Sequence, residues 1–206
     1  MASGEQPQSP AHGPSNEPPI LTLSRNLAVR QFRTSDAEQV AKHSNDKVMW
    51  LHGPDAVPHP FTLTDAQAYI SKSLDTSRWH PSGPSWAGPT LPILYAITQN
   101  DVVIGSIGFS AGEDVRARGV SIGYWIAREF WGKGIATEVV GAFVEWIWER
   151  FPKIVRVEAE VYEFNGGSGR VLGKVGFVHE GTLRGAVWKD GKVAGLEVWG
   201  MVRKGL

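Results

Sequence analysis

The chain has 206 residues, with 21 basic and 21 acidic side chains and a formal net charge of +0 at pH 7. This balance does not favour nucleic acid or an anionic membrane as a partner, because both select for a surplus of basic residues. With 0 Cys, the chain can form no disulfide, thiolate metal site or cysteine nucleophile. Its 42% hydrophobic content suffices for one buried core, so we expect a single domain.

The first 19 residues are rich in proline, with Ser, Gln, Gly and Glu between the prolines. Such a segment cannot bury enough apolar surface to order itself, so we expect a disordered tail over residues 1–19 and the domain over residues 20–206. No basic stretch with an apolar stretch behind it opens the chain, and no apolar run is long enough to span a bilayer. We therefore expect a cytoplasmic protein, either a monomer or a homodimer.

The first half of the domain predicts a strand and two helices, followed by a hairpin. Residues 21–33 are β-prone, and Thr34-Ser35-Asp36 offers capping side chains for a helix to about His43. Residues 50–61 are rich in glycine and proline and predict a loop. Residues 64–67 resemble a capping box and predict a helix to about Leu74. The proline-rich residues 79–92 predict a long irregular insertion, and residues 93–110 a hairpin that turns at Asn100-Asp101.

The second half predicts strands separated by two helices. Residues 119–126 predict a strand, and the long helix after it should end near Pro152, because proline disfavours helix at the preceding residue. Residues 155–162 alternate as a strand does, and residues 166–175 predict a short helix. The last two strands, over 177–186 and 193–202, should turn at Asp190-Gly191. Strands 119–126 and 155–162 should be parallel neighbours, because a long helix connects them.

A Gly-Lys-Gly turn, residues 132–134, joins the 119–126 strand to the long helix. The first N–H groups of a helix have no partner within it and lie at the positive end of its dipole. Glycines at such a turn let a ligand approach these amides closely, which suits a phosphate. Taken alone, Gly132 and Gly134 could serve only to shape a tight connection between strand and helix.

The flanking residues extend this motif. Trp131-Gly132-Lys133-Gly134-Ile135-Ala136, with Thr137 and Glu138 behind it, resembles the pyrophosphate-binding segment Gln/Arg-x-x-Gly-x-Gly/Ala of the GNAT superfamily of acetyltransferases. Trp131 stands where that pattern has Gln or Arg. With this departure, the segment resembles the RimJ/RimL-like branch of the superfamily. The resemblance implies one α/β domain, a mixed sheet of around seven strands with flanking helices, and a central parallel pair that splays apart. It also implies acetyl-CoA as co-substrate.

A second motif follows the 155–162 strand. Asn165-Gly166-Gly167-Ser168-Gly169-Arg170, continued by Val171 to Phe177, resembles the RimJ/RimL-like pattern Asn-x-x-Ser-x-Arg-Val-Leu-x-Lys-x-Gly-Phe. Asn165 offers both a donor and an acceptor, which suits the amide-rich pantetheine arm of coenzyme A. Alone, it could be a helix cap and Ser168 a first-turn residue. The cofactor-binding residues that we predict are Tyr124, Trp125, Ile126, Trp131, Gly132, Lys133, Gly134, Ile135, Ala136, Thr137, Asn165, Ser168 and Arg170.

The resemblance implies direct transfer of an acetyl group from acetyl-CoA to a primary amine. Such transfer needs a base for the amine, backbone donors for the oxyanion and a proton for the leaving thiolate. Many GNAT enzymes use a tyrosine as that acid, but Leu172 occupies the position here, so the resemblance assigns the role to Ser168, with Tyr162 as the weaker candidate. Relatives often carry a glutamate at the position of Ser121, and we leave the base unassigned among Glu113, Glu158 and Glu160.

Other readings of the sequence are weaker. Gly108-Phe109-Ser110-Ala111-Gly112 matches a hydrolase nucleophile pattern, but no helix is predicted after Ser110, as that chemistry needs. His52 and His59 lack the spacing of a metal motif, and we expect no metal. The acceptor could be a protein N-terminus or a small amine. The alternative is a non-catalytic acyl-CoA-binding module on the same fold.

Overall fold

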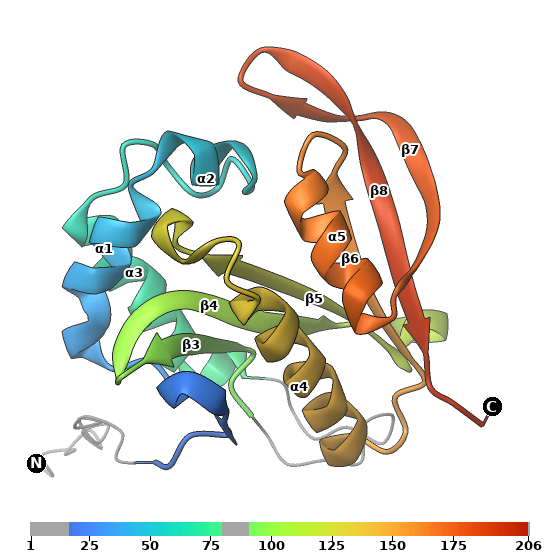
Figure 1. Ribbon diagram of the computed structural model, residues 1–206, viewed down its shortest axis with the longest axis horizontal. Coiled ribbons are helices and arrows are strands. Elements are labelled where there is room, and N and C mark those ends of the chain that lie inside the picture. Colours follow the sequence, from blue (N-terminus) through green and yellow to red (C-terminus); the bar gives the residue numbers. More distant parts are fainter. Residues whose placement is uncertain (1–16, 80–90, 206) are drawn as a thin grey trace, which may run out of the picture.

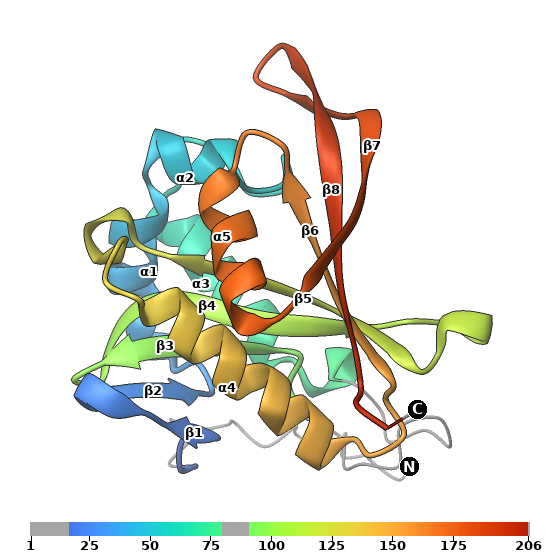
Figure 2. The ribbon, with the colours of Figure 1, turned by 45° about the vertical axis from the view of Figure 1, so that its right-hand side comes forward.

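The computed structural model describes residues 17–79 and 91–205. Residues 1–16 of the predicted tail over residues 1–19, and residues 80–90 of the predicted insertion, lie outside the described residues. Within them, one mixed sheet of eight strands runs in the order β1-β2-β3-β4-β5-β6-β8-β7, with helices on both faces (Figures 1 and 2). Helices α4 and α5 lie on one face, and α1 and α3 on the other.

The element bounds follow from the backbone. The strands are β1 (Leu21–Thr22), β2 (Leu27–Arg30), β3 (Leu94–Gln99), β4 (Val102–Ala111), β5 (Gly119–Ile126), β6 (Arg156–Tyr162), β7 (Val178–Lys189) and β8 (Lys192–Val202). The helices are α1 (Ala37–Ser44), α2 (Lys47–Leu51), α3 (Leu63–Leu74), α4 (Ile135–Arg150) and α5 (Gly166–Val175). Short 3₁₀ turns lie at Ser24–Asn26, Thr34–Asp36, Thr76–Arg78, Asp114–Arg116 and Arg128–Phe130.

The predicted mixed α/β sheet is confirmed, with one strand more than expected. The segment read as a single strand over residues 21–33 is broken at Arg25 and Asn26, whose φ angles are 55° and 57°. The break leaves β1 and β2 as an antiparallel pair, which accounts for the extra strand. It is fixed by a tertiary contact, because the Arg25 guanidinium donates to the carbonyl of Lys133 at 2.7 Å.

Two predictions for the connection between α1 and α3 were wrong. Residues 50–61 begin in helix rather than loop, since α2 includes Trp50 and Leu51 and is capped by the Asp46 carboxylate, which accepts from the N–H groups of Val48 and Met49. The capping box of α3 is formed by Thr62 and Asp65, so the helix begins at Leu63 rather than after Thr64. In both cases a local side-chain oxygen satisfies free N–H groups.

The core is divided by the sheet. One buried cluster joins the α4 face to the strands, with Phe143, Val144 and Ile147 of α4 at 0–1% exposure. The other lies under α1 and α3 and includes Phe32, Val40 and Ile70. Strands β5 and β6 contribute alternate residues to the first cluster, because successive side chains of a strand point to opposite faces. Their remaining side chains therefore face the α1 and α3 side of the sheet.

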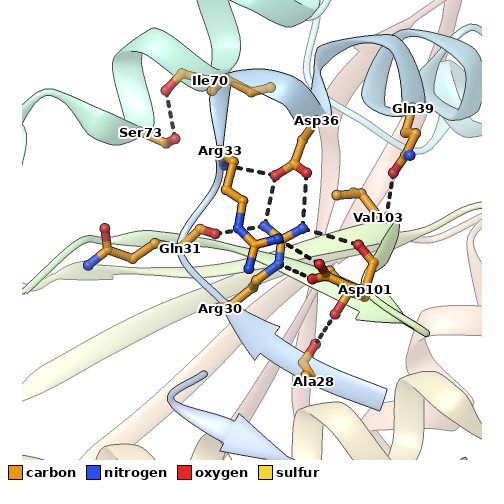
Figure 3. A network of polar contacts seen from close by, with 11 residues as sticks. Ala28, Arg30, Gln31, Arg33, Asp36, Gln39, Ile70, Ser73, Asp101 and Val103 are labelled. Carbon is orange, nitrogen blue, oxygen red and sulfur yellow. Dashed lines mark hydrogen bonds and ion pairs between the residues drawn. The ribbon is translucent and has the colours of Figure 1, made fainter. Parts of the chain in front are cut away.

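A buried ion-pair network fixes β2 to the start of α1 and to the β3–β4 turn (Figure 3). The Arg30 side chain, 3% exposed, donates to both carboxylate oxygens of Asp36 at 2.8 and 3.0 Å, and its Nε donates to Asp101 at 2.9 Å. Asp36 also accepts from the backbone N–H of Arg33 at 2.8 Å. Hydrogen bonds from Arg33 and Arg30, working against the effect of burial, lower the pKa of the Asp101 carboxyl.

We predict that Asp36→Asn lowers the free energy of unfolding by about 3 kcal/mol, because it leaves the buried Arg30 charge with less compensation. Urea denaturation at constant m-value measures the change. As a control, Arg116→Gln removes an ion pair to Glu158 whose arginine side chain is 73% exposed. That change should cost less than about 1 kcal/mol. Equal losses in the two variants would show that the network does not fix the fold.

Candidate functional site

The central parallel pair parts after three residues. Strands β5 and β6 are in register at Gly119↔Arg156, Val120↔Val157 and Ser121↔Glu158, and no register pair follows. Beyond Ser121, β5 continues its pairing with β4 alone as far as Ile126. This confirms the predicted parallel neighbours. The strands enclose a cavity of about 1000 Å³ where they separate, lined by residues of β4, β5, β6, α4, α5 and the α2 region.

The Gly-Lys-Gly turn closes one end of this cavity. Gly132 and Gly134 have φ angles of 73° and 76°, a left-handed conformation that glycine adopts without a steric cost. A Cβ added at either position would meet no atom within 4 Å, so the space above the turn is open. Gly134 is the N-cap of α4, and among the described residues no side chain caps this helix end. Ile135, Ala136 and Thr137, whose N–H groups lie at that end, all line the cavity.

Lys133 does not line the cavity, although we predicted it as a phosphate ligand. Its ammonium lies 5.2 Å from the ring centroid of Phe130. A second cation near the turn is also engaged, because Arg128 pairs with Asp46 at 2.9 Å. The cations that line the cavity are instead Arg170, which was predicted, and Lys174, which was not; both belong to α5. Lys174 belongs to the second motif, but the motif alone did not show that this side chain lines the cavity, because that depends on how α5 packs.

Trp131 lies beside the end of β5. Its indole Nε1 donates to the carbonyl of Ile126 at 2.6 Å, so the side chain folds back onto the strand. Its ring stacks on His52, with ring centroids 5.9 Å apart and an interplanar angle of 18°. His52 also contacts Phe164 from the β6 side, at 6.1 Å between centroids. These three rings form a continuous aromatic wall across the mouth of the separated strands.

The second motif lies at the start of α5. Asn165 is the N-cap: its Oδ1 accepts from the N–H of Ser168 at 3.3 Å, and its Nδ2 donates to Ser168 Oγ at 3.1 Å. Both side chains line the cavity. Because the Ser168 hydroxyl oxygen accepts from Asn165, its own proton is free to be donated elsewhere. Asn165 thus caps the helix and orients Ser168, so the cap reading and the site reading are compatible.

Two tyrosines, Tyr124 and Tyr162, line the same cavity as this pair. Tyr124 donates from its hydroxyl to the carbonyl of Ser168 at 3.5 Å, and burial raises its pKa to about 12. Burial, together with the charges of Asp55 and Glu160, raises the pKa of Tyr162, which packs on Phe164. Both hydroxyls are therefore protonated at neutral pH. Leu172, at the position of the usual tyrosine acid, is fully buried and lines the cavity.

The far side of the cavity is formed by the α2 region. This side is lined by Met49, Trp50, His52, Gly53, Pro54, Val57 and Phe61. Tyr69 also lines it, and its hydroxyl donates to Ser106 Oγ at 3.1 Å. Burial lowers the pKa of His52, so its imidazole is neutral at pH 7. Sequence spacing gave no signal for His52 or Tyr69, because neither belongs to a motif. The glycine and proline content of residues 50–61, 79–92 and 188–193 predicts that these segments form the substrate pocket, and the first of them contributes to the cavity.

The β7–β8 turn contributes only indirectly. None of residues 188–193 lines the cavity. Instead, Lys189 is buried at the hairpin tip, where its ammonium donates to Asp55 at 2.6 Å and lies 3.9 Å from the ring centroid of Trp50. The hairpin thereby supports the α2 region from outside. Across the described residues, no group of three or more His, Cys, Asp or Glu could hold a metal ion, and no helix could cross a membrane.

The sequence and the fold of this chain are similar to those of known proteins. The profile of the acetyltransferase (GNAT) domain family matches residues 26–178. The uncharacterized N-acetyltransferase YoaA of Bacillus subtilis is 29% identical over 191 residues, covering 90% of this chain and 97% of that protein. RimJ of Mycobacterium smegmatis, solved with CoA-disulfide, superimposes with a TM-score of 0.71 at 20% identity, covering 87% of this chain and 83% of that one.

RimL, a ribosomal L7/L12 alpha-N-protein acetyltransferase solved with coenzyme A, superimposes with a TM-score of 0.70 at 18% identity. The match covers 90% of this chain and 98% of that one. At these identities the solved structures show a shared fold, while the sequence profile spans most of the domain. The parted parallel strands, the glycine turn at the start of α4 and the Asn165–Ser168 pair are thus found in a chain that belongs to the GNAT acetyltransferase family.

Proposed function

We propose that this protein transfers the acetyl group of acetyl-CoA directly to a primary amine, with both bound together in the cavity between β5 and β6. The observation that carries the proposal is that residues of both motifs line one cavity, at the point where the sheet is open. Acetyl-CoA supplies an activated acyl carbon on a good leaving group. The remaining chemistry falls to this chain: binding, orientation and proton transfer.

The residues present fit a phosphate-bearing, amide-rich ligand. The free N–H groups at the start of α4 hold its pyrophosphate, in the open space above Gly132 and Gly134. Arg170 and Lys174 add positive charge from the facing helix. Beyond Ser121, β5 has no β6 partner, so its backbone groups there are available to a ligand. These features support acetyl-CoA over a ligand without a phosphate group.

Two proton transfers must accompany the reaction. A free alkylamine has a pKa of about 10, so the acceptor arrives protonated and must lose a proton before it attacks. The thiolate that leaves gains from a donor, and Ser168 supplies it, since Asn165 holds its oxygen and leaves its proton free. Tyr162 is the second candidate, because its raised pKa keeps it protonated.

The proposal is tested by isothermal titration with acetyl-CoA, followed by thiol release over an amine panel that includes peptides with free N-termini, amino sugars, polyamines and amino acids. We expect binding and release of coenzyme A with at least one amine. Binding without turnover on every amine would instead support a non-catalytic acyl-CoA-binding module.

The proposed pyrophosphate site predicts that a negative charge at the Gly-Lys-Gly turn weakens acetyl-CoA binding. Gly134→Asp should weaken acetyl-CoA binding about tenfold or more, because it places a negative charge beside the phosphates. Gly191→Asp is the matched control, since Gly191 also has a positive φ angle, 77°, and open space around it. Calorimetry should find the control unchanged. An unchanged dissociation constant in a folded Gly134→Asp variant would move the pyrophosphate site elsewhere.

The role proposed for Ser168 predicts that its loss affects kcat more than KM. Ser168→Ala should lower kcat by ~10²–10⁴-fold while the KM for acetyl-CoA changes much less, because the hydroxyl acts as charge develops on sulfur. Ser168→Thr, which keeps a hydroxyl, should retain more of the activity. Asn165→Ala should weaken cofactor binding first and lower stability by about 1 kcal/mol through the lost cap. If Ser168→Ala keeps its kcat with chemistry rate-limiting, the proton comes from Tyr162 or water.

A further inference from the structure

Glu160 differs from every other carboxylate near the open strands. It is the one Asp or Glu side chain, over residues 17–79 and 91–205, that lines the cavity. It is exposed, and no described side chain or backbone N–H forms a hydrogen bond or ion pair with it. A carboxylate without a partner at the wall of a cavity is available to accept a proton from a ligand.

The strand register places Glu160 just past the point where the sheet opens. Val157, Ala159 and Val161 of β6 belong to the core on the α4 face, so Glu158 and Glu160 face the opposite side. Glu158 is in register with Ser121, the last paired residue of β5. Glu160 is the next residue of β6 on that face.

The strand opposite leaves room beside Glu160. Two residues beyond Ser121, on the same face of β5, lies Gly123. Gly123 is exposed and lines the cavity, and a Cβ added there would meet no atom within 4 Å. An acceptor can therefore approach the opening from the α1 and α3 side at this level, next to the Glu160 carboxylate.

The other candidate bases are engaged or lie elsewhere. Glu158 accepts from Arg156 at 2.9 Å and from Arg116 at 2.7 Å. Glu163 accepts from the backbone N–H of Gly195 at 2.9 Å. Glu113 lies on the β4–β5 connection and does not line the cavity. Of the three glutamates left open by the sequence, the geometry selects Glu160.

We propose that Glu160 accepts the proton of the acceptor amine, directly or through one water, an inference that rests on the proposed function. The amine nitrogen forms a bond to the acyl carbon with its lone pair, and the C–S bond breaks. One proton of the ammonium passes to the Glu160 carboxylate before the attack. The Ser168 hydroxyl protonates the departing thiolate and regains a proton as the nitrogen loses its second one on becoming an amide. Glu160 thus supplies from β6 the carboxylate that Ser121 does not supply from β5.

Several ionisable groups surround this position. Glu158 and Tyr162 lie on the same face of β6, and the charge of Glu160 helps to raise the pKa of Tyr162. From the α2 region, His52 lines the cavity. Asp55 of the same region is paired with Lys189 of the hairpin tip. On β8, the register partner of Glu160 is the uncharged Val198. Among these groups His52 is the competing base, because it lines the cavity and is neutral at pH 7.

The test uses the full chain and the amine of the panel with the highest kcat/KM. Glu160→Gln should keep its fold and its affinity for acetyl-CoA, while kcat falls by ~10²–10⁴-fold. Its kcat/KM should rise about tenfold per pH unit toward the pKa of the amine, near 10, because free amine then forms without help. The wild type should reach its plateau at lower pH.

Two variants serve as controls. Glu158→Gln, on the same face of the same strand, should keep the wild-type kcat and pH profile, and His52→Gln should keep the wild-type pH profile. An unchanged Glu160→Gln with chemistry rate-limiting, or loss of the pH plateau in His52→Gln alone, would overturn the assignment of Glu160 and leave the acetyltransferase standing. Wild-type protein that binds acetyl-CoA but acetylates no amine would overturn both proposals.

Discussion

The separation of β5 from β6 is the constraint on which the rest of the site depends. Two parallel strands that stop pairing after Ser121↔Glu158 leave backbone donors and acceptors without sheet partners in the middle of the domain. Such groups are costly to bury unless something else satisfies them. A ligand with amide groups meets that need, and the gap also connects the two faces of the sheet. In the proposed function, one backbone feature therefore provides both the cofactor channel and the approach for the acceptor.

The glycine turn is held in place from a distance. Arg25, in the 3₁₀ turn between β1 and β2, donates to the carbonyl of Lys133 and pairs with Glu138 in the first turn of α4 at 2.5 Å. The same carboxylate accepts from the N–H of Ser24 at 2.9 Å. Arg25 adopts a left-handed backbone conformation, which is unfavourable for a residue with a side chain and persists only when its surroundings impose it. The N-terminal strands thus brace the loop that we propose as the phosphate site.

The site departs from the family pattern at three positions, and each departure is compensated by a neighbour. Trp131 replaces a polar residue and becomes part of an aromatic wall with His52. Leu172 replaces a tyrosine acid and is buried in the core, while Ser168 lies one helical turn earlier, with its hydroxyl oriented by Asn165. Ser121 replaces a glutamate, and the proposed base comes from the adjacent strand. Side chains from different elements converge on one cavity, so a given role can move between strands.

The sequence by itself determined the elements around the site. In β5 and β6 the side chains alternate between the two faces of the sheet. This alternation, like the glycine turn and the Asn165 cap, depends on interactions between residues close together in the chain. The parallel pairing followed because a helical connection of that length permits little else. Only the tertiary structure decided which side chains meet. The break in the first strand at Arg25, the position of Lys133 outside the cavity, and the meeting of His52, Lys174 and Glu160 in one cavity depend on contacts between residues far apart in the chain. Local pattern named Lys174 and Glu160 but could not show that they meet.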